Sequence, residues 1–288
     1  MEFAKVEGLS MASLVTGAVL AFAIPLAAML IWKFRKKERF TTILVGAAAF
    51  LLFALILEKP IQNALLFPTQ MGLPENAVSR FFDANPVLLA LAAGLFPGIF
   101  EETGRLIAYK ALLRKRKNRE TSVSFGLGYG GAEVMLTMGI TYITYIVYAV
   151  MINSGLFGTL VEQTAALAPG QEGALISLAD QIAGITIADV GIGLAERVFA
   201  VLFHIGASIL LFYACRDKNR RWLYPLAVIL HTGMDFVGAL YVLEVVSIPL
   251  WAVEICAAAF GILTFLGAYF LLYRKDVDSS SQFHTISL

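Results

Sequence analysis

Charged residues are scarce in this sequence. Asp, Glu, Lys and Arg make up 15% of the 288 residues, whereas hydrophobic residues make up 59%. A soluble globular domain carries about 25% charged residues, so this chain has too few of them to cover a core with a hydrated surface. The mean hydropathy of +0.77 agrees with this. The composition therefore predicts a polytopic membrane protein of the all-α class.

Cysteine is also rare, and other features of common protein classes are missing. The two cysteines, Cys215 and Cys256, lack the spacing of a disulfide framework or a zinc motif, so we expect small buried hydrophobes. No basic stripe with interleaved aromatic residues is present, which argues against a nucleic-acid partner. The first apolar run is too long for a signal-peptide core, so we expect no cleavable signal peptide.

Long apolar runs, by contrast, are abundant. Seven of them are long enough to cross a bilayer as helices, for which about 20 residues suffice. They cover residues 9–32, 40–57, 86–113, 121–151, 187–214, 222–246 and 249–273. Between the second and third spans, residues 58–85 are predicted to be interfacial, with a short surface helix at 74–82. Residues 153–180 are predicted to be a loop that ends in an amphipathic turn.

The basic residues are distributed unevenly between the two ends of these spans. Clusters follow the first, third, fifth and seventh spans, at residues 33–39, 114–119, 216–221 and 274–275. The positive-inside rule then predicts seven transmembrane helices with the N-terminus outside and the C-terminus in the cytosol. No internal repeat is evident, so residues 1–275 are predicted to form one domain, followed by a polar, disordered tail at 276–288.

The third span contains charged residues within its apolar sequence. Glu101, Glu102 and Arg105 lie near its middle, where each ionised side chain costs about 2.5–3.5 kcal/mol on an insertion scale. Both glutamates share a helix face with the arginine, at spacings i, i+4 and i, i+3. The arginine can therefore hold one carboxylate in its ionised form while the other acts chemically.

Other spans place ionisable groups at the same depth. Counting about 1.5 Å of rise per residue from the basic clusters places groups of four spans roughly 15–21 Å from one surface. These residues are Glu101, Glu102, Glu133, His204, His231 and Asp235. Asp235 is four residues from His231 and can orient its imidazole. This common depth predicts a shared, hydrated site near the bilayer midplane.

Each of these groups also has a simpler structural interpretation. His204 could bond a neighbouring helix, and the glycine-rich run 126–131 could serve close helix packing. Glu133 could be a protonated structural carboxyl, and Glu196 with Arg197 could form a local ion pair. The shared depth favours function over four independent structural roles.

Several chemistries fit two histidines and several carboxylates. One carboxylate could act as general base on water while a second polar group stabilises the oxyanion. Alternatively, His204, His231 and Glu102 could bind Zn²⁺ and activate a bound water. The sequence contains no H-E-x-x-H and no G-x-S-x-G motif. Proton-coupled transport would also use such residues, but the repeats and broken helices typical of transporters are not found.

In combination, these motifs resemble those of the YhfC family of bacterial intramembrane peptidases, which is similar to the CAAX-protease and bacteriocin-processing group. The motifs are Glu101-Glu102-x-x-Arg105, the glycine run that ends at Glu133, Glu196-Arg197 with His204, and His231-x-x-x-Asp235. The resemblance implies a glutamate-dependent peptidase, with zinc as a further option, that acts on a membrane-embedded peptide or protein in a bacterial plasma membrane. On that reading one of the two glutamates activates water with His204, and His231 with Asp235 supports the oxyanion.

The sequence departs from these families at three points. The Glu-Glu to Arg spacing is one residue shorter than in the larger group, Phe199 and His204 are one residue further apart, and Tyr129 stands where a histidine is expected. The chain also resembles Aph-1, the scaffold subunit of γ-secretase, in its seven spans and in Ser124-Phe125-Gly126. This second resemblance implies a non-catalytic scaffold or chaperone subunit with a membrane protein partner. The intact glutamate pair favours the peptidase.

Overall fold

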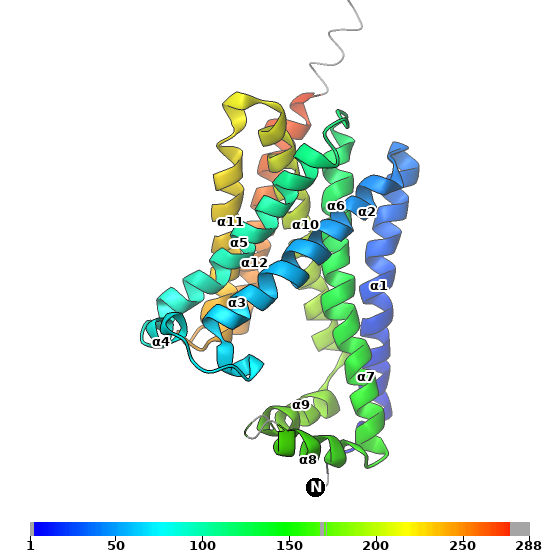
Figure 1. Cartoon of the computed structure of the whole chain (residues 1–288). Coiled ribbons are helices and arrows are strands. Elements are labelled where there is room, and N and C mark those ends of the chain that lie inside the picture. The colour runs from blue at the N-terminus through cyan, green and yellow to red at the C-terminus, as the bar shows by residue number, and fades with distance from the viewer. Residues whose placement is uncertain (1–2, 168–169, 171, 277–288) are drawn as a thin grey trace, which may run out of the picture. The chain divides into compact units, whose positions relative to one another are not determined.

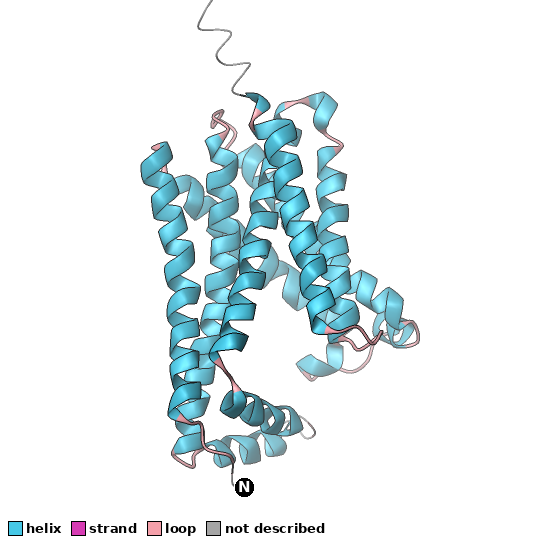
Figure 2. Cartoon of the chain, turned by 180° about the vertical axis from the view of Figure 1, so that it is seen from behind, coloured by secondary structure: helices cyan, strands magenta, loops and turns pink. Residues whose placement is uncertain are grey.

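The computed structural model describes residues 3–167, 170 and 172–276, and its regular elements are helices (Figures 1 and 2). Seven helical runs are long and apolar enough to cross a membrane, which confirms the predicted all-α, seven-span architecture. The direction of insertion stays a prediction. The predicted tail lies outside the described residues except for Asp276. The cysteines are free thiols and are half-buried rather than buried.

The seven runs agree closely with the predicted spans. They are α1 (Gly8–Lys36); α2 (Phe40–Phe50) continued by a π-helical segment (Leu51–Glu58) and α3 (Lys59–Leu66); α5 (Pro86–Ala111); α6 (Glu120–Val134) continued by a second π-helical segment (Met135–Gly139) and α7 (Ile140–Asn153); α10 (Ile187–Arg216); a run at Lys218–Val242 that contains α11 (Leu223–Val242); and α12 (Leu250–Ala268) with a final π-helical turn (Tyr269–Tyr273).

Two predicted connections differ from the structure. The second span does not end near residue 57 but continues to Leu66, so that Glu58 belongs to the span. The predicted loop at 153–180 instead forms two helices, α8 (Phe157–Leu167) and α9 (Glu172–Gly184). The predicted surface helix is present as α4 (Ala77–Asp83), where the Asn76 side chain caps two backbone N–H groups.

The chain forms two compact units. The first comprises Met1–Leu26 and Glu133–Arg197, and the second comprises Ala27–Ala132 and Val198–Leu288. In the first unit, the core contains Leu14, Tyr142, Phe157 and Ile182, all at most 8% exposed. Phe157 and Ile182 belong to α8 and α9, so burial of their apolar faces explains why these segments form helices rather than a loop.

In the second unit, glycines bring helices into close contact. A Cβ added at Gly94 of α5 would lie 2.7 Å from the backbone nitrogen of Phe236 in α11, and one at Gly98 would lie 2.5 Å from Thr232 Oγ1. Helices α5 and α11 accordingly run side by side (Figure 1). On α6, a Cβ at Gly126 would lie 2.6 Å from Cα of Ile205 in α10. The glycine run therefore does serve close helix packing.

Candidate functional site

Arg105 lies at the centre of a buried polar network in the second unit. Its side chain has no solvent exposure. Its Nε atom is 3.1 Å from Glu102 Oε2, and its Nη2 atom is 3.7 Å from Glu101 Oε2. The sequence spacing along α5 produces both ion pairs, since residues three and four apart share a helix face. The positive charge of Arg105 compensates the cost of burying these carboxylates.

Arg105 also connects α5 to α10. Its Nη1 atom donates to the Ser208 hydroxyl at 3.0 Å and to the backbone oxygen of His204 at 3.2 Å. Its Nη2 atom lies 2.6 Å from His204 Nδ1. Because a guanidinium has only donors, Nδ1 must accept, and the proton of a neutral His204 ring is then on Nε2. The contact fixes this tautomer and directs an N–H donor away from Arg105.

His231 of α11 completes the network. Its Nδ1 atom is 2.8 Å from Glu102 Oε1, and an ionised carboxylate can only accept. Its Nε2 atom lies 3.5 Å from Asp235 Oδ2 and 3.8 Å from Glu101 Oε2. The edge of the Phe203 ring packs against the imidazole, with centroids 4.9 Å apart. His231 is thus oriented by Glu102 on one side and faces two further carboxylates on the other.

Tyr129 covers the Arg105 side of the network. The guanidinium lies over its ring at 4.0 Å, and the His204 ring is 5.2 Å away. The residue that replaces an expected histidine therefore stacks on the arginine, with cation–π attraction as the physical role.

The structure brings together six of the seven predicted site residues. Glu101, Glu102, Arg105, His204, His231 and Asp235 form this connected group. Glu133 belongs to the first unit, where its Oε1 atom accepts from Arg197 at 3.0 Å. Arg197 also binds Glu196, so the local ion pair is present. A catalytic role for Glu133 stays a prediction.

Glu58 is a buried carboxylate that the sequence reading left in a connecting segment. It ends the first π-helical segment, is 0% exposed, and has two oxygens without hydrogen bonds. Its Oε1 atom is 3.5 Å from Lys59 Nζ. Asp235 and His231 are among the charged groups that act on it. An acidic residue at the end of a long apolar run could have signalled this position.

The run that carries Glu58 contacts α5 on both sides of this residue. Before it, the Phe53 ring occupies the space beside Gly104, where an added Cβ would lie 2.4 Å away. After it, Gln62 Nε2 donates to the backbone oxygen of Ala93 at 2.8 Å. Glu58 therefore lies along the part of α5 that carries the glutamate pair. π-Helical segments are frequent at functional sites.

The three residues predicted as tentative zinc ligands do not form a metal-binding group here. Within the described residues, no three His, Cys, Asp or Glu side chains are arranged to hold a metal ion. The His204 Nδ1 atom faces Arg105, and both Glu102 oxygens face Arg105 or His231. A metal ligand needs a lone pair directed at the ion. As arranged, His204 and Glu102 direct no free lone pair at a common point and do not fit the role of metal ligands.

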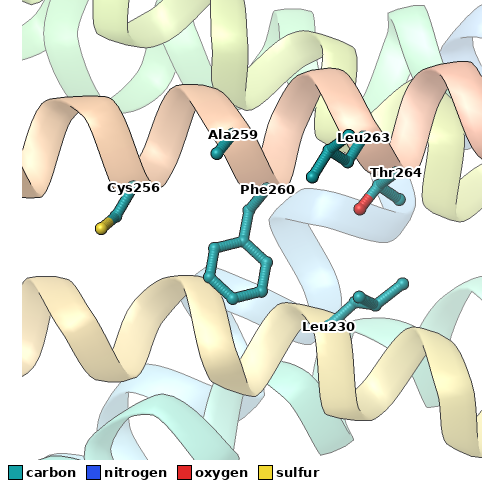
Figure 3. Close-up of a pocket in the computed structure, with 6 residues that line it drawn as sticks. All are labelled: Leu230, Cys256, Ala259, Phe260, Leu263 and Thr264. Carbon is teal, nitrogen blue, oxygen red and sulfur yellow. The ribbon is translucent and has the colours of Figure 1, made fainter.

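Figure 3 shows a pocket with an apolar lining. It is formed by Leu230 of α11 and by Cys256, Ala259, Phe260, Leu263 and Thr264 of α12. Leu230 precedes His231 in the sequence, yet the lining contains no carboxylate and no imidazole. The polar network, rather than this apolar pocket, is the candidate active site.

Comparison with known proteins identifies the family of the chain. Residues 20–257 match the family described as YhfC intramembrane metalloprotease. The chain belongs to the YhfC family. The uncharacterized membrane protein YhfC of Bacillus subtilis (strain 168) is 28% identical over 263 residues, which cover 91% of this chain and 95% of the relative. No solved structure matches the chain.

YhfC membership and the seven apolar helices identify a multi-pass membrane protein. The bacterial relative is consistent with a location in a bacterial plasma membrane. The matched region contains every residue of the network. The YhfC family is described as proteolytic, whereas the Bacillus relative is uncharacterized. Activity, substrate and catalytic residues are therefore proposals.

Proposed function

We propose that this YhfC-family protein is an intramembrane peptidase that hydrolyses a peptide bond of a membrane-associated substrate, with Glu101 as general base. The observation that carries the proposal is the division of roles around Arg105. The arginine engages Glu102 and the Nδ1 atom of His204 directly, and it lies 3.7 Å from Glu101. Metalloprotease membership supports the reaction class.

Glu102 is assigned to positioning. One oxygen faces Arg105 Nε and the other accepts from His231 Nδ1, and the side chain is fully buried. A carboxylate with an ion pair on one oxygen and a hydrogen bond on the other orients its partners well but has little freedom to collect a proton. Glu101 is 7% exposed, and its Oε2 atom is 3.8 Å from His231 Nε2, a separation that one water can bridge.

The proposed reaction uses these groups in a defined order. Glu101 removes a proton from a water that accepts a hydrogen bond from His204 Nε2–H, and the water oxygen attacks the carbonyl carbon. His231 takes part as the doubly protonated imidazolium, which donates from Nδ1 to Glu102 and from Nε2 to the oxyanion. The C–N bond then breaks, and the proton held by Glu101 passes to the leaving nitrogen.

The family description implies a metal, which would supply a Lewis acid and an activated water. With Glu102 and His204 turned toward Arg105, the described arrangement offers no complete ligand set. The proposed reaction therefore relies on the acid–base groups of the chain, and zinc dependence is a separate question for measurement.

The test compares single amide substitutions in full-length protein. Glu101→Gln should abolish cleavage in membranes, measured by mass spectrometry of peptide products, and leave the unfolding temperature unchanged. Glu102→Gln should abolish cleavage and also lower the unfolding temperature, because it removes the partner of Arg105 and His231. Glu75→Gln, in an exposed connection, is the matched control.

The alternative scaffold or chaperone function predicts a different result. A stoichiometric membrane partner would co-purify, and Glu101→Gln would leave its binding and every peptide product unaltered. Normal processing by Glu101→Gln protein would remove the general-base assignment. Proton-driven uptake by liposomes without peptide products would instead indicate a transporter.

A further inference from the structure

A second polar feature of the second unit lies at the ends of α5 and α10 that carry basic clusters. A cavity of about 360 Å³ opens there, and five of its lining residues are basic. Lys110 lies in the last turn of α5, and Arg216 ends α10. The connection from α5 to α6 contributes Arg114, Arg116 and Lys117. The aromatic rings of Tyr109 and Phe212, 5.6 Å apart, form its inner wall.

Only some of these positive charges are compensated. Arg216 pairs with Asp276 at 3.9 Å, stacks on Phe212 at 4.5 Å and donates to the backbone oxygen of Lys117. Arg116 donates to Thr41 Oγ1 at 3.2 Å. Within the described part of the chain, Lys110, Arg114 and Lys117 form no ion pair. Three uncompensated cations therefore border one cavity.

Charge alone does not distinguish this cavity from an ordinary basic loop, but its walls do. Leu113 is buried and lines it together with the aromatic residues. The cavity thus combines an apolar wall, formed where membrane helices end, with a cationic rim. Basic pockets of this kind between membrane helices fit the phosphate of lipid headgroups.

We propose that this cavity binds a phosphate group, presented by an anionic phospholipid headgroup of the adjacent leaflet. Lys110, Arg114 and Lys117 contact the phosphate oxygens, and the apolar wall contacts the glycerol and upper acyl region. Arg216 stabilises the pocket through Phe212 and the Lys117 backbone. The proposal is independent of the peptidase assignment, because it uses none of the network residues.

The position of the cavity connects the lipid to the network. Tyr109 lies one helical turn beyond Arg105, and its ring contacts Phe125 with centroids 4.8 Å apart. Phe212 lies two turns beyond His204 on α10. A ligand held between the two helix ends would bridge the elements that carry Arg105 and His204, and so restrain their spacing.

The experiment measures binding to full-length protein in neutral detergent. The probes are dihexanoyl phosphatidylglycerol, dihexanoyl phosphatidylcholine and inorganic phosphate, and the readout is the shift in unfolding temperature with ligand concentration. We expect phosphatidylglycerol to stabilise the protein at lower concentration than phosphatidylcholine. Near a surface each lysine contributes about fivefold in affinity for an anionic lipid, so Lys110→Gln with Lys117→Gln should weaken phosphatidylglycerol binding roughly 30-fold.

The control pair is Lys115→Gln with Lys275→Gln, which removes equal charge from residues that do not line the cavity. It should leave the preference for phosphatidylglycerol intact. Saturable stabilisation by inorganic phosphate, lost in the cavity pair, supports the phosphate site and shows that free phosphate also enters. Unchanged phosphatidylglycerol binding in the cavity pair, or equal loss in the control pair, would overturn the proposal.

Discussion

The contact between α5 and α11 determines whether His231 reaches Glu102, and Gly94→Ala perturbs it directly. The added Cβ would lie 2.7 Å from the Phe236 nitrogen and 2.8 Å from the Thr232 oxygen, both backbone atoms. Backbone of a packed helix cannot turn away as a flexible side chain can. Ordinary contact begins near 3.4 Å, so the helices must separate by roughly 0.7 Å in a tightly packed interior.

That displacement predicts two measurable effects. Overpacking of this size costs about 1–3 kcal/mol of unfolding free energy, which thermal unfolding of purified protein detects. Misplacement of catalytic groups by about 1 Å lowers rates by roughly 100-fold, which the appearance of peptide products detects. The His231–Glu102 bond of 2.8 Å is the first contact of the network to lengthen.

Gly238→Ala is the matched control, because it lies on α11 and an added Cβ there meets no atom within 4 Å. It should keep full activity and gain up to about 1 kcal/mol from helix propensity. If Gly94→Ala proves as stable and as active as Gly238→Ala, the helices are not packed as described, and the placement of His231 beside Glu102 fails with it.

Three further predictions concern the network itself. Arg105→Met should lower the free energy of unfolding by about 3–5 kcal/mol, because it leaves the Glu102 carboxylate buried without its cation. If this loss of stability is smaller than that of the exposed control variant Arg80→Met, Arg105 does not have the central role described. Glu58→Gln should raise the unfolding temperature, because a neutral amide replaces a buried carboxylate whose oxygens lack hydrogen bonds. The same substitution should slow cleavage, because it removes a charge that acts on His231. A lower unfolding temperature of the variant would refute this reasoning. Activity should persist in a strong chelator, with no stoichiometric zinc by elemental analysis, since His204 and Glu102 are turned to Arg105. One zinc per chain, lost together with activity, would refute the metal-free reaction.

Sequence spacing was sufficient for contacts within one helix. The pairs of Glu101 and Glu102 with Arg105 follow from their separation along α5, and the His231–Asp235 contact follows from one turn of α11. The seven spans were equally predictable, because a bilayer requires long apolar runs. Local geometry therefore accounts for much of the network and for nearly all of the fold.

Contacts between helices were less predictable. Counting residues gives depth but not rotation about the helix axis, so the contact between Glu133 and Arg197 was not predicted. The Arg105–His204 contact needed the rotation of both helices. Glu58 was missed for another reason: an apolar run was taken to end at its first charge, whereas the helix continues for two more turns.

The arrangement around Arg105 also separates the peptidase from the scaffold hypothesis. A purely structural network needs Arg105, Glu102 and His231, whose contacts at 3.1 and 2.8 Å join α5 to α11. The ion pair of Glu101 is the longer one, with its Oε2 atom 3.7 Å from Arg105 Nη2. The two amide substitutions therefore differ in kind. If Glu101→Gln removes peptide products without lowering stability, a chemical role is required, because loss of packing cannot explain that result.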